Sequence, residues 1–435
     1  SYYDGFQDDN CAVAMMLGIA RALLETGYRP RKTLVFCAMA AEEWGVVDSK
    51  YDWSTGAYEQ VFTAHPEWQG KVIADFNFEL PAHAHGKKDA VRCTYEYASF
   101  MKKATEHIQP SKEAYPEGLE VHFPIQTWSD DFSIAIAGIP SSVNEFSDGE
   151  FMETHYHSQF DNEDFYDEPV YRFHHNLYGK LVLAFDHTAV VPMDFERLFA
   201  AVEDSVEKAL CEKTQANETN LLERLKKAKE LGHQLYDQIQ KINETYKNLL
   251  EAGKYEEAKA MAAEYAALNS SLLYIFRKEQ DYFVRLNWHD DVLFPQQGVG
   301  ENLKVIYKAL GCLKEDDPEG ALEAVYEIDN NRYAFLFDRE VFRYFTEYVL
   351  NQPADRLKWG YGRIIHHENL YDLVVSLKEK NKLQKAGERP DLEEEYKILL
   401  QAANAQEQCY RDDIDYMASS VEKLLAAMEG CVQKQ

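Results

Sequence analysis

Hydrophobic and polar positions along the first 194 residues alternate between a helical period and a strand period. Apolar residues recur every three or four positions between Asn10 and Glu25, which predicts an amphipathic helix ending just before Gly27. Its expected buried face is Val13, Met16, Ile19, Ala20 and Leu23. Short apolar runs predict strands at 33–39, 72–78, 119–123 and 141–146, and a closing helix is expected at 171–190. This order predicts an α/β fold, a mostly parallel sheet flanked by helices.

Strand patterns disappear after about residue 194, and long helical patterns replace them. Three-four spacing runs from Leu225 to Leu249 and again from Ala258 to Leu286, on either side of a turn containing Gly253. Two such helices joined by a short turn predict a long antiparallel helical hairpin. We therefore expect an α/β domain over 1–194 and an all-α domain over 195–435. The all-α domain is expected to act as a lid, a packing surface or a dimerisation surface, and a homo-oligomer stays open.

The net charge and the cysteines of the chain limit which binding partners and which cellular compartment we expect. The chain carries 75 acidic and 46 basic residues, a net charge of −29. This excess repels nucleic acid and anionic membranes, so neither is an expected partner, and acidic clusters favour divalent metal instead. No apolar run reaches the length of a membrane span. Seven scattered cysteines without a Cys-x-x-Cys pair favour the cytoplasm, and secretion stays open because we expect a part before Ser1 to be missing.

Metal-ligand residue types cluster in four short segments, each at the end of an expected strand or in an adjoining loop. These segments are Asp8-Asp9-Asn10, Glu42-Glu43, Asn77-Phe78-Glu79 and Tyr156-His157 with the following Asp161. Side chains alternate along a strand, so the adjacent Glu42 and Glu43 should point in different directions. One carboxylate can then hold a metal while the other acts on a bound water, as metal-assisted hydrolysis requires. Taken singly, each segment also fits an ordinary role, such as a helix N-cap or a solvated loop.

Taken in order, the segments resemble the co-catalytic di-zinc exopeptidases of metallopeptidase family 28. That family includes bacterial leucyl aminopeptidases, glutamate carboxypeptidase and the glutaminyl cyclases. The matching elements are Asp8-Asp9-Asn10-Cys11-Ala12-Val13-Ala14, Glu42-Glu43-Trp44-Gly45, Asn77-Phe78-Glu79, Ser129-Asp130, Gly138-Ile139-Pro140 and Tyr156-His157-Ser158. The resemblance covers residues 1 to about 190 and leaves the helical half outside it.

The resemblance implies the zinc exopeptidase fold and a site for two zinc ions. In such a site Asp8 would bridge both ions and precede a cis peptide bond. Glu43 and His157 would be the other ligands of one ion, and Glu79 would bind the second ion. Glu42 would be the general base acting on a hydroxide that bridges the metals, and Tyr156 would stabilise the oxyanion. The side chains expected to orient these groups are Asp9, Asp130 and Asp161.

Three departures from the family pattern affect this assignment of metal ligands. Ala12 stands where the family has glycine, which keeps a small side chain at the helix start. Glu79 stands where aspartate is usual, so Asp75 and Asn77 stay open as alternative ligands. The family's His-x-Asp element would lie before Ser1, and a site without its histidine would have fewer protein ligands for one ion.

The sequence therefore predicts a zinc-dependent exopeptidase acting on peptides. An acidic site suits a free α-ammonium group, and no basic cluster stands near the motifs to grip a carboxylate, so aminopeptidase activity is the first expectation. One alternative is a single-zinc aminoacyl transferase of the glutaminyl cyclase type. The other is a non-catalytic interaction protein with a relic site, but such a relic has no chemical reason to retain Glu42 and Tyr156.

Overall fold

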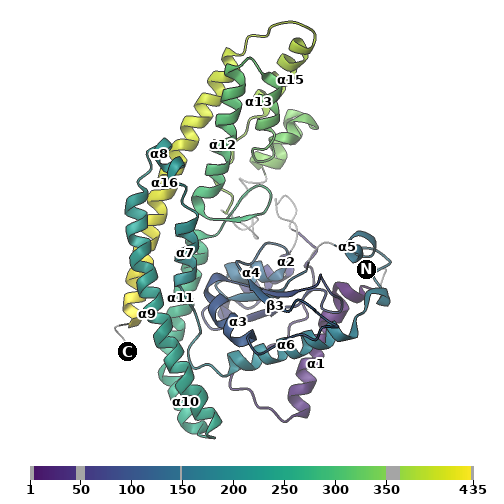
Figure 1. The fold of residues 1–435 in the computed structure, drawn as a ribbon, viewed down its shortest axis with the longest axis vertical. Helices are drawn as coiled ribbons and strands as arrows, with labels where there is room; N and C mark the ends of the chain where they lie inside the picture. Colours follow the sequence, from purple (N-terminus) through teal and green to yellow (C-terminus); the bar gives the residue numbers. More distant parts are fainter. Residues whose placement is uncertain (1–3, 46–53, 147–148, 349–362, 433–435) are drawn as a thin grey trace.

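The computed structural model describes residues 4–45, 54–146, 149–348 and 363–432. An α/β portion lies beside a long array of helices, and the last helix of the chain runs along that array (Figure 1). This arrangement agrees with the prediction of an α/β region followed by a helical region. Among the described helices, none is long and apolar enough to cross a membrane.

Four short strands form a mixed sheet in the order β1-β4-β2-β3. The strands are β1 (Asp75–Asn77), β2 (Asp89–Cys93), β3 (Leu119–His122) and β4 (Ser141–Asn144). Strand β1 pairs with β4 and β2 pairs with β3 in parallel, whereas β2 and β4 are antiparallel. The sequence analysis missed β2 because Arg92 interrupts its apolar run; the Arg92 guanidinium pairs with Glu145 at 2.9 Å.

The strand expected at 33–39 is not formed. Residues 33–41 run without helix, turn or bend, yet they pair with no strand in the part of the chain that the structure describes. Val35 is 57% exposed and Phe36 is 42% exposed. The apolar pattern correctly indicates an extended segment, but a strand also needs a hydrogen-bonded neighbour, and none of the described strands pairs with it.

Among the described residues of the α/β portion, six segments form α-helices. They are α1 (Cys11–Glu25), α2 (Thr55–Glu59), α3 (Ala98–Thr105), α4 (Asp130–Ile136), α5 (Glu150–Thr154) and α6 (Glu168–Asp186). Helix α1 ends as predicted, with Gly27 at φ +70° just beyond it. Its buried side chains are Cys11, Ala12, Met15 and Ile19, so the expected face is rotated, and Val13 is 37% exposed. The closing helix α6 begins earlier than expected because Asp167 caps it by accepting a bond from the Val170 N–H.

The helical array contains the predicted hairpin. Its elements are α7 (Glu196–Asp204), α8 (Lys208–Thr214), α9 (Glu218–Glu251), α10 (Tyr255–Glu264), α11 (Ala266–Phe283), α12 (Pro295–Lys314), α13 (Pro318–Val325), α14 (Arg339–Arg343), α15 (Tyr371–Lys385) and α16 (Glu393–Val432). The hairpin turns at Gly253, where φ is +72°, a conformation that glycine adopts without a steric penalty. Its second arm is interrupted at Tyr265, so it forms two helices rather than the single one expected.

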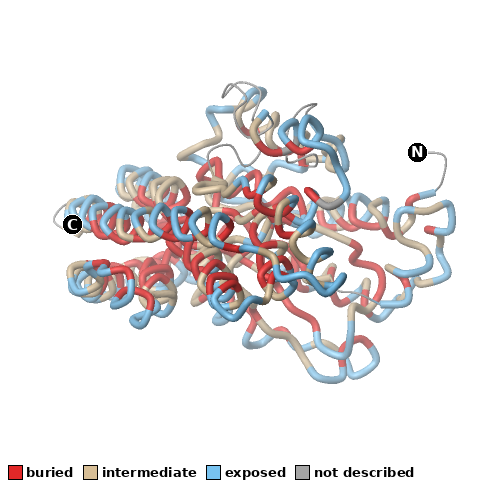
Figure 2. The backbone as a smooth tube through the Cα atoms, turned by 90° about the horizontal axis from the view of Figure 1, so that it is seen from above, coloured by how far each residue is buried: buried red, intermediate tan, exposed pale blue. Residues whose placement is uncertain are grey.

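One buried apolar cluster joins the two parts of the molecule. It includes Leu181 of α6, Leu235 of α9 and Leu424 of α16, and buried segments continue from one part into the other in Figure 2. Asn243 of α9 reinforces the junction, because its side-chain oxygen accepts bonds from the Ala189 and Val190 N–H groups. The helical array is therefore packed against the α/β portion rather than tethered to it.

Two carboxyl groups meet inside this junction. Glu96 lies in a short helical turn, η4 (Tyr95–Tyr97), and Glu279 lies in α11; their side chains are 1% and 0% exposed. Burial raises the pKa of Glu96 to about 7, and burial followed by repulsion from Glu96 raises the pKa of Glu279 well above its usual value. Two buried carboxylates close together repel each other, so this arrangement favours protonation of at least one of them.

We expect the free energy of unfolding to fall as pH rises through this pair's titration. A raised pKa means that the folded state holds the proton, so Glu96 contributes fully below pH 4.5 and loses its contribution as pH approaches about 7. The loss for Glu96 is up to about 3 kcal/mol. Glu279→Gln should flatten this slope in urea unfolding series at several pH values. Glu264→Gln, an exposed matched control on the same hairpin, should keep it. Equal slopes in both variants would contradict the assignment.

Candidate metal centre

The loop that carries Asp8 is held by hydrogen bonds to a buried aspartate. Asp8 lies in η1 (Phe6–Asn10), directly before α1. The N–H groups of Gln7 and Asp8 each donate to the carboxylate of Asp161 at 2.9 Å, and Asp161 is fully buried. Gly5 has φ +55°, and a Cβ there would lie 2.7 Å from the Asp8 carbonyl oxygen, so only glycine fits this turn. The Asp8–Asp9 peptide bond is cis, as the family resemblance implies.

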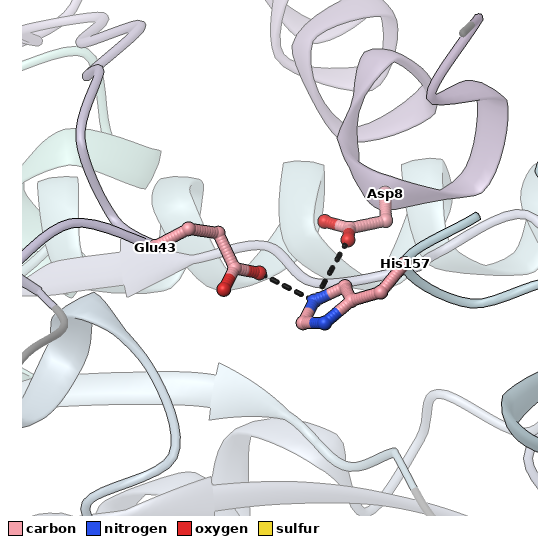
Figure 3. A group of neighbouring side chains, drawn as sticks. All are labelled: Asp8, Glu43 and His157. Atoms are coloured by element: carbon pink, nitrogen blue, oxygen red, sulfur yellow. Dashed lines mark ion pairs between the residues drawn. The ribbon is translucent and has the colours of Figure 1, made fainter. Parts of the chain in front are cut away.

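Three of the four expected ligands converge. The His157 Nε2 atom lies 2.5 Å from Glu43 Oε1 and 3.5 Å from Asp8 Oδ2, and the three side chains point toward one another (Figure 3). One ligand atom from each residue falls within 4.8 Å of the others. The Asp8 side chain is 19% exposed, whereas Glu43 and His157 are 52% and 45% exposed. Solvent therefore reaches all three side chains, Asp8 least.

The fourth expected ligand, Glu79, does not belong to this group of three. Its carboxylate accepts a hydrogen bond from the Ser129 hydroxyl, which in turn accepts one from the Asn77 side chain at 2.6 Å. The Glu79 backbone is held on both sides by the Asn144 side chain, whose oxygen accepts from the Glu79 N–H at 2.7 Å. Glu79 therefore points from the end of β1 into the buried side of the cluster.

Ser129 and Asn144 are functional neighbours that the sequence analysis did not single out. Ser129 stands beside Asp130 in the Ser-Asp element, and Asn144 lies within the strand predicted at 141–146, so their positions in the sequence were known. The sequence did not show that both residues bond to Glu79, because only the folded sheet brings β1 next to β4. Of the alternative ligands, Asn77 supports Ser129, and Asp75 lies buried behind it with a pKa raised to about 7 by burial.

Glu42 lies among the carboxylates without joining the group of three. Burial raises its pKa to about 9, and repulsion from neighbouring carboxylates, Glu79 first, adds to the shift. Burial likewise raises the pKa of Glu79 to about 8 and that of Asp8 to about 6. So many acidic groups in one place are unfavourable unless a cation offsets their charge.

The remaining expected residues surround this cluster. Asp9 is buried and accepts a bond from the Leu80 N–H at 3.3 Å, and burial raises its pKa well above the usual range. Asp130 begins α4, and burial raises its pKa to about 6. The Tyr156 ring stacks on the His157 ring with centroids 3.7 Å apart. Burial and repulsion from the cluster's carboxylates, Asp8 first, raise the pKa of Tyr156, so its phenol stays protonated.

The donor set fits zinc. Carboxylate oxygens and an imidazole nitrogen are ordinary zinc ligands, and they converge here from three separate segments with further carboxylates behind them. A second carboxylate next to a ligand, Glu42 beside Glu43, is what a hydrolytic metal centre needs for proton transfer.

These features place the α/β portion in the class of metal-dependent hydrolases. Residues 1–182 match the model of peptidase family M28. This portion of the chain is similar to that metallopeptidase family, and the match ends near the close of α6. No curated protein matches the chain.

Proposed function

We propose that this chain is a zinc-dependent aminopeptidase that removes residues from the amino termini of peptides. The observation that carries the proposal is the convergence of Asp8, Glu43 and His157 beside the non-liganding carboxylate Glu42. In this scheme those three residues would hold one zinc ion, and Glu79 together with Asp8 would hold a second.

Zinc, when bound, would polarise the substrate carbonyl and make a water acidic enough to attack at neutral pH. The chain's own residues supply the other parts of the reaction. Glu42 accepts a proton from the attacking water and delivers it to the leaving amine. Tyr156, protonated and stacked on His157, donates a hydrogen bond to the oxygen on which negative charge develops.

The charge of the site favours an amino terminus over a carboxyl terminus. Asp8, Asp9, Glu42, Glu43 and Glu79 form an acidic group, and a free α-ammonium is attracted to it whereas a carboxylate is repelled. Within the residues that the structure describes, the ion pairs of Asp8 and Glu43 are both to His157, and neither is to a lysine or arginine.

A single-zinc aminoacyl transferase of the cyclase type remains the second candidate. The observation in its favour is that Asp8, Glu43 and His157 form one compact group that does not include Glu79, whose carboxylate accepts a hydrogen bond from Ser129. The number of zinc ions bound at saturation separates the two candidates, since the aminopeptidase scheme needs two and the transferase scheme needs one.

The test uses the natural full-length polypeptide and paired substrates. Hydrolysis of an aminoacyl-anilide should be lost on chelation and return on adding zinc, and the N-acetylated form of the same anilide should not be cleaved. Cleavage of both forms would contradict the amino-terminal preference. Formation of a cyclised product from an amino-terminal glutaminyl peptide, without hydrolysis of the anilide, would favour the transferase. No turnover with two zinc ions bound would favour an interaction protein.

A further inference from the structure

A short β-hairpin joins helices α11 and α12 of the helical array. Its strands are β5 (Arg285–Leu286) and β6 (Val292–Leu293), which pair in antiparallel orientation. The Asn287 side chain holds the turn between them, because its oxygen accepts hydrogen bonds from the His289 and Asp291 N–H groups at 2.9 and 3.1 Å. Asparagine side chains commonly fix turns by such bonds to nearby backbone groups. The β5–β6 hairpin therefore has a defined conformation, and it lies outside the residues that match the peptidase family.

This hairpin packs against the segment of the α/β portion that leads into α4. Leu286 shares a buried apolar cluster with Ile125, at the start of that segment, and with Phe132 of α4. Between those two contacts, the Thr127 hydroxyl donates a hydrogen bond to the Asp290 carbonyl, in the hairpin turn, at 2.9 Å. Thr127 is only 2% exposed, and a hydrogen bond shielded from water is electrostatically stronger. The hairpin therefore holds the segment at both of its ends and near its middle.

The same segment carries the serine that bonds to Glu79. Ser129 stands two residues after Thr127 and is 1% exposed. Its hydroxyl accepts a hydrogen bond from the Asn77 side chain at 2.6 Å and donates one to the Glu79 carboxylate. A serine hydroxyl has one proton to donate, so the position of Ser129 decides where that carboxylate oxygen is held. A shift of the segment would move the donor away from Glu79.

The helical array also holds the far end of α4, on the side of the α/β portion that faces the array (Figure 1). Gly138 follows this helix with φ +93°, and a Cβ on it would lie 2.8 Å from the Cβ of Arg277 on α11. The Arg277 guanidinium donates a hydrogen bond to the Ala137 carbonyl. Glycine is needed at 138 for its backbone conformation and for this close approach. Helix α4 and the segment before it are therefore held by the array from end to end.

We propose that the helical array positions the Glu79 carboxylate for metal binding, with Thr127 as the positioning residue. In this scheme the β5–β6 hairpin holds Thr127, the segment holds Ser129, and Ser129 holds the carboxylate. The inference rests on the proposed function, because it takes Glu79 as a ligand of the second zinc ion. It gives the helical array a part in the metal centre, although the array lies outside the residues that match the peptidase family.

The first test replaces Thr127 with valine in the full-length polypeptide, which keeps the shape of the side chain and removes its hydroxyl. Thr127→Val should weaken binding of the second zinc ion by about 10–100-fold, the usual contribution of residues that orient a ligand. Binding of the first ion, by Asp8, Glu43 and His157, should not change. Thr127→Ser restores the hydroxyl and should bind both ions as the parent does. Zinc titration with a competing chelator measures both affinities.

Thr105→Val is the matched control, because Thr105 is 6% exposed but its hydroxyl bonds within α3, to the Met101 carbonyl. It should bind both zinc ions as the parent does. A merely structural role for Thr127 would weaken both ions alike, and that result would overturn the proposal. Unchanged binding of the second ion in Thr127→Val would overturn it as well.

The second test changes the helical array alone. Asn287→Ala removes the bonds that hold the hairpin turn, so it should also weaken the second zinc ion and leave the first unchanged. Combined with Thr127→Val, it should change the affinity by less than the product of the two separate effects, because both act through one contact. Fully multiplicative effects would contradict the proposal. Asn248→Ala, at an exposed asparagine of α9, should have no effect on either ion.

These titrations separate this inference from the proposed function, because they require no turnover. A parent chain that binds two zinc ions but cleaves no anilide contradicts the proposed function, and its second ion still reports on Thr127. An active parent chain whose second ion is insensitive to Thr127→Val contradicts this inference alone. A parent chain that binds only one zinc ion at saturation overturns both.

Discussion

Replacing Glu42 with glutamine is expected to lower kcat for aminoacyl-anilide hydrolysis by about 10²–10⁴-fold, the usual range for losing a general base. Glutamine keeps the size of the side chain but cannot accept the proton. Because Glu42 stands outside the group formed by Asp8, Glu43 and His157, bound zinc and KM should change little. The kcat value and the zinc content should be measured on the same preparation.

The matched control is Glu25→Gln, an exposed carboxylate at the end of α1 with 63% of its side chain accessible. It should leave kcat unchanged. If Glu42→Gln retains full activity, Glu42 is not the base, whatever the metal content. If Glu42→Gln loses zinc together with activity, Glu42 is a ligand rather than a proton carrier. The pair of measurements therefore distinguishes the two roles of the adjacent glutamates.

Replacing Asp8 with asparagine is expected to lower zinc affinity by at least about 100-fold, since even residues that only orient a ligand contribute 10–100-fold. Asp8 contacts His157 directly, and its own loop is held by Asp161 through the backbone N–H groups of Gln7 and Asp8. Those bonds do not involve the Asp8 side chain, so the loop should keep its conformation. Zinc titration with a competing chelator measures the loss, and circular dichroism checks the fold.

Asp164→Asn is the control for this change, because Asp164 is a 68% exposed aspartate near the same histidine loop. It should bind zinc as the parent does. Unchanged zinc affinity in Asp8→Asn would remove Asp8 from the ligand set and, with it, the shared-carboxylate scheme. A loss of helical signal in the same variant would indicate that Asp8 serves the loop rather than the metal.

Periodicity located most elements because it depends on local physics. The hairpin from Leu225 onward was predictable since buried positions on a helix recur every three or four residues, and observed buried residues such as Leu225, Leu235 and Ile239 follow that spacing. The break at Tyr265 was not predictable, because nothing in the local pattern marks it. Strand β2 was missed for the opposite reason: Arg92 looks polar in the sequence, and only its pairing with Glu145 makes it compatible with a buried sheet.

The same distinction applies to the candidate site, where the sequence located the residues and only the fold showed which of them lie together. The ordered motifs marked Asp8, Glu43 and His157, and these three do lie together. The motifs also marked Glu79, but not that Ser129 would bond to its carboxylate and Asn144 to its backbone. A hydrogen bond between residues 50 or more positions apart leaves no periodic pattern in the sequence, so sequence spacing could not place this carboxylate.

The sequence by itself determined which residues are chemically able to bind a metal and which segments are apolar enough to be buried, because both properties belong to individual side chains and their spacing. Only the tertiary structure decided which carboxylates meet His157, how the helical array joins the α/β portion, and that the segment 33–39 lies across a cavity from β1. These outcomes depend on contacts between distant parts of the chain, and such contacts are set by the packing of whole elements.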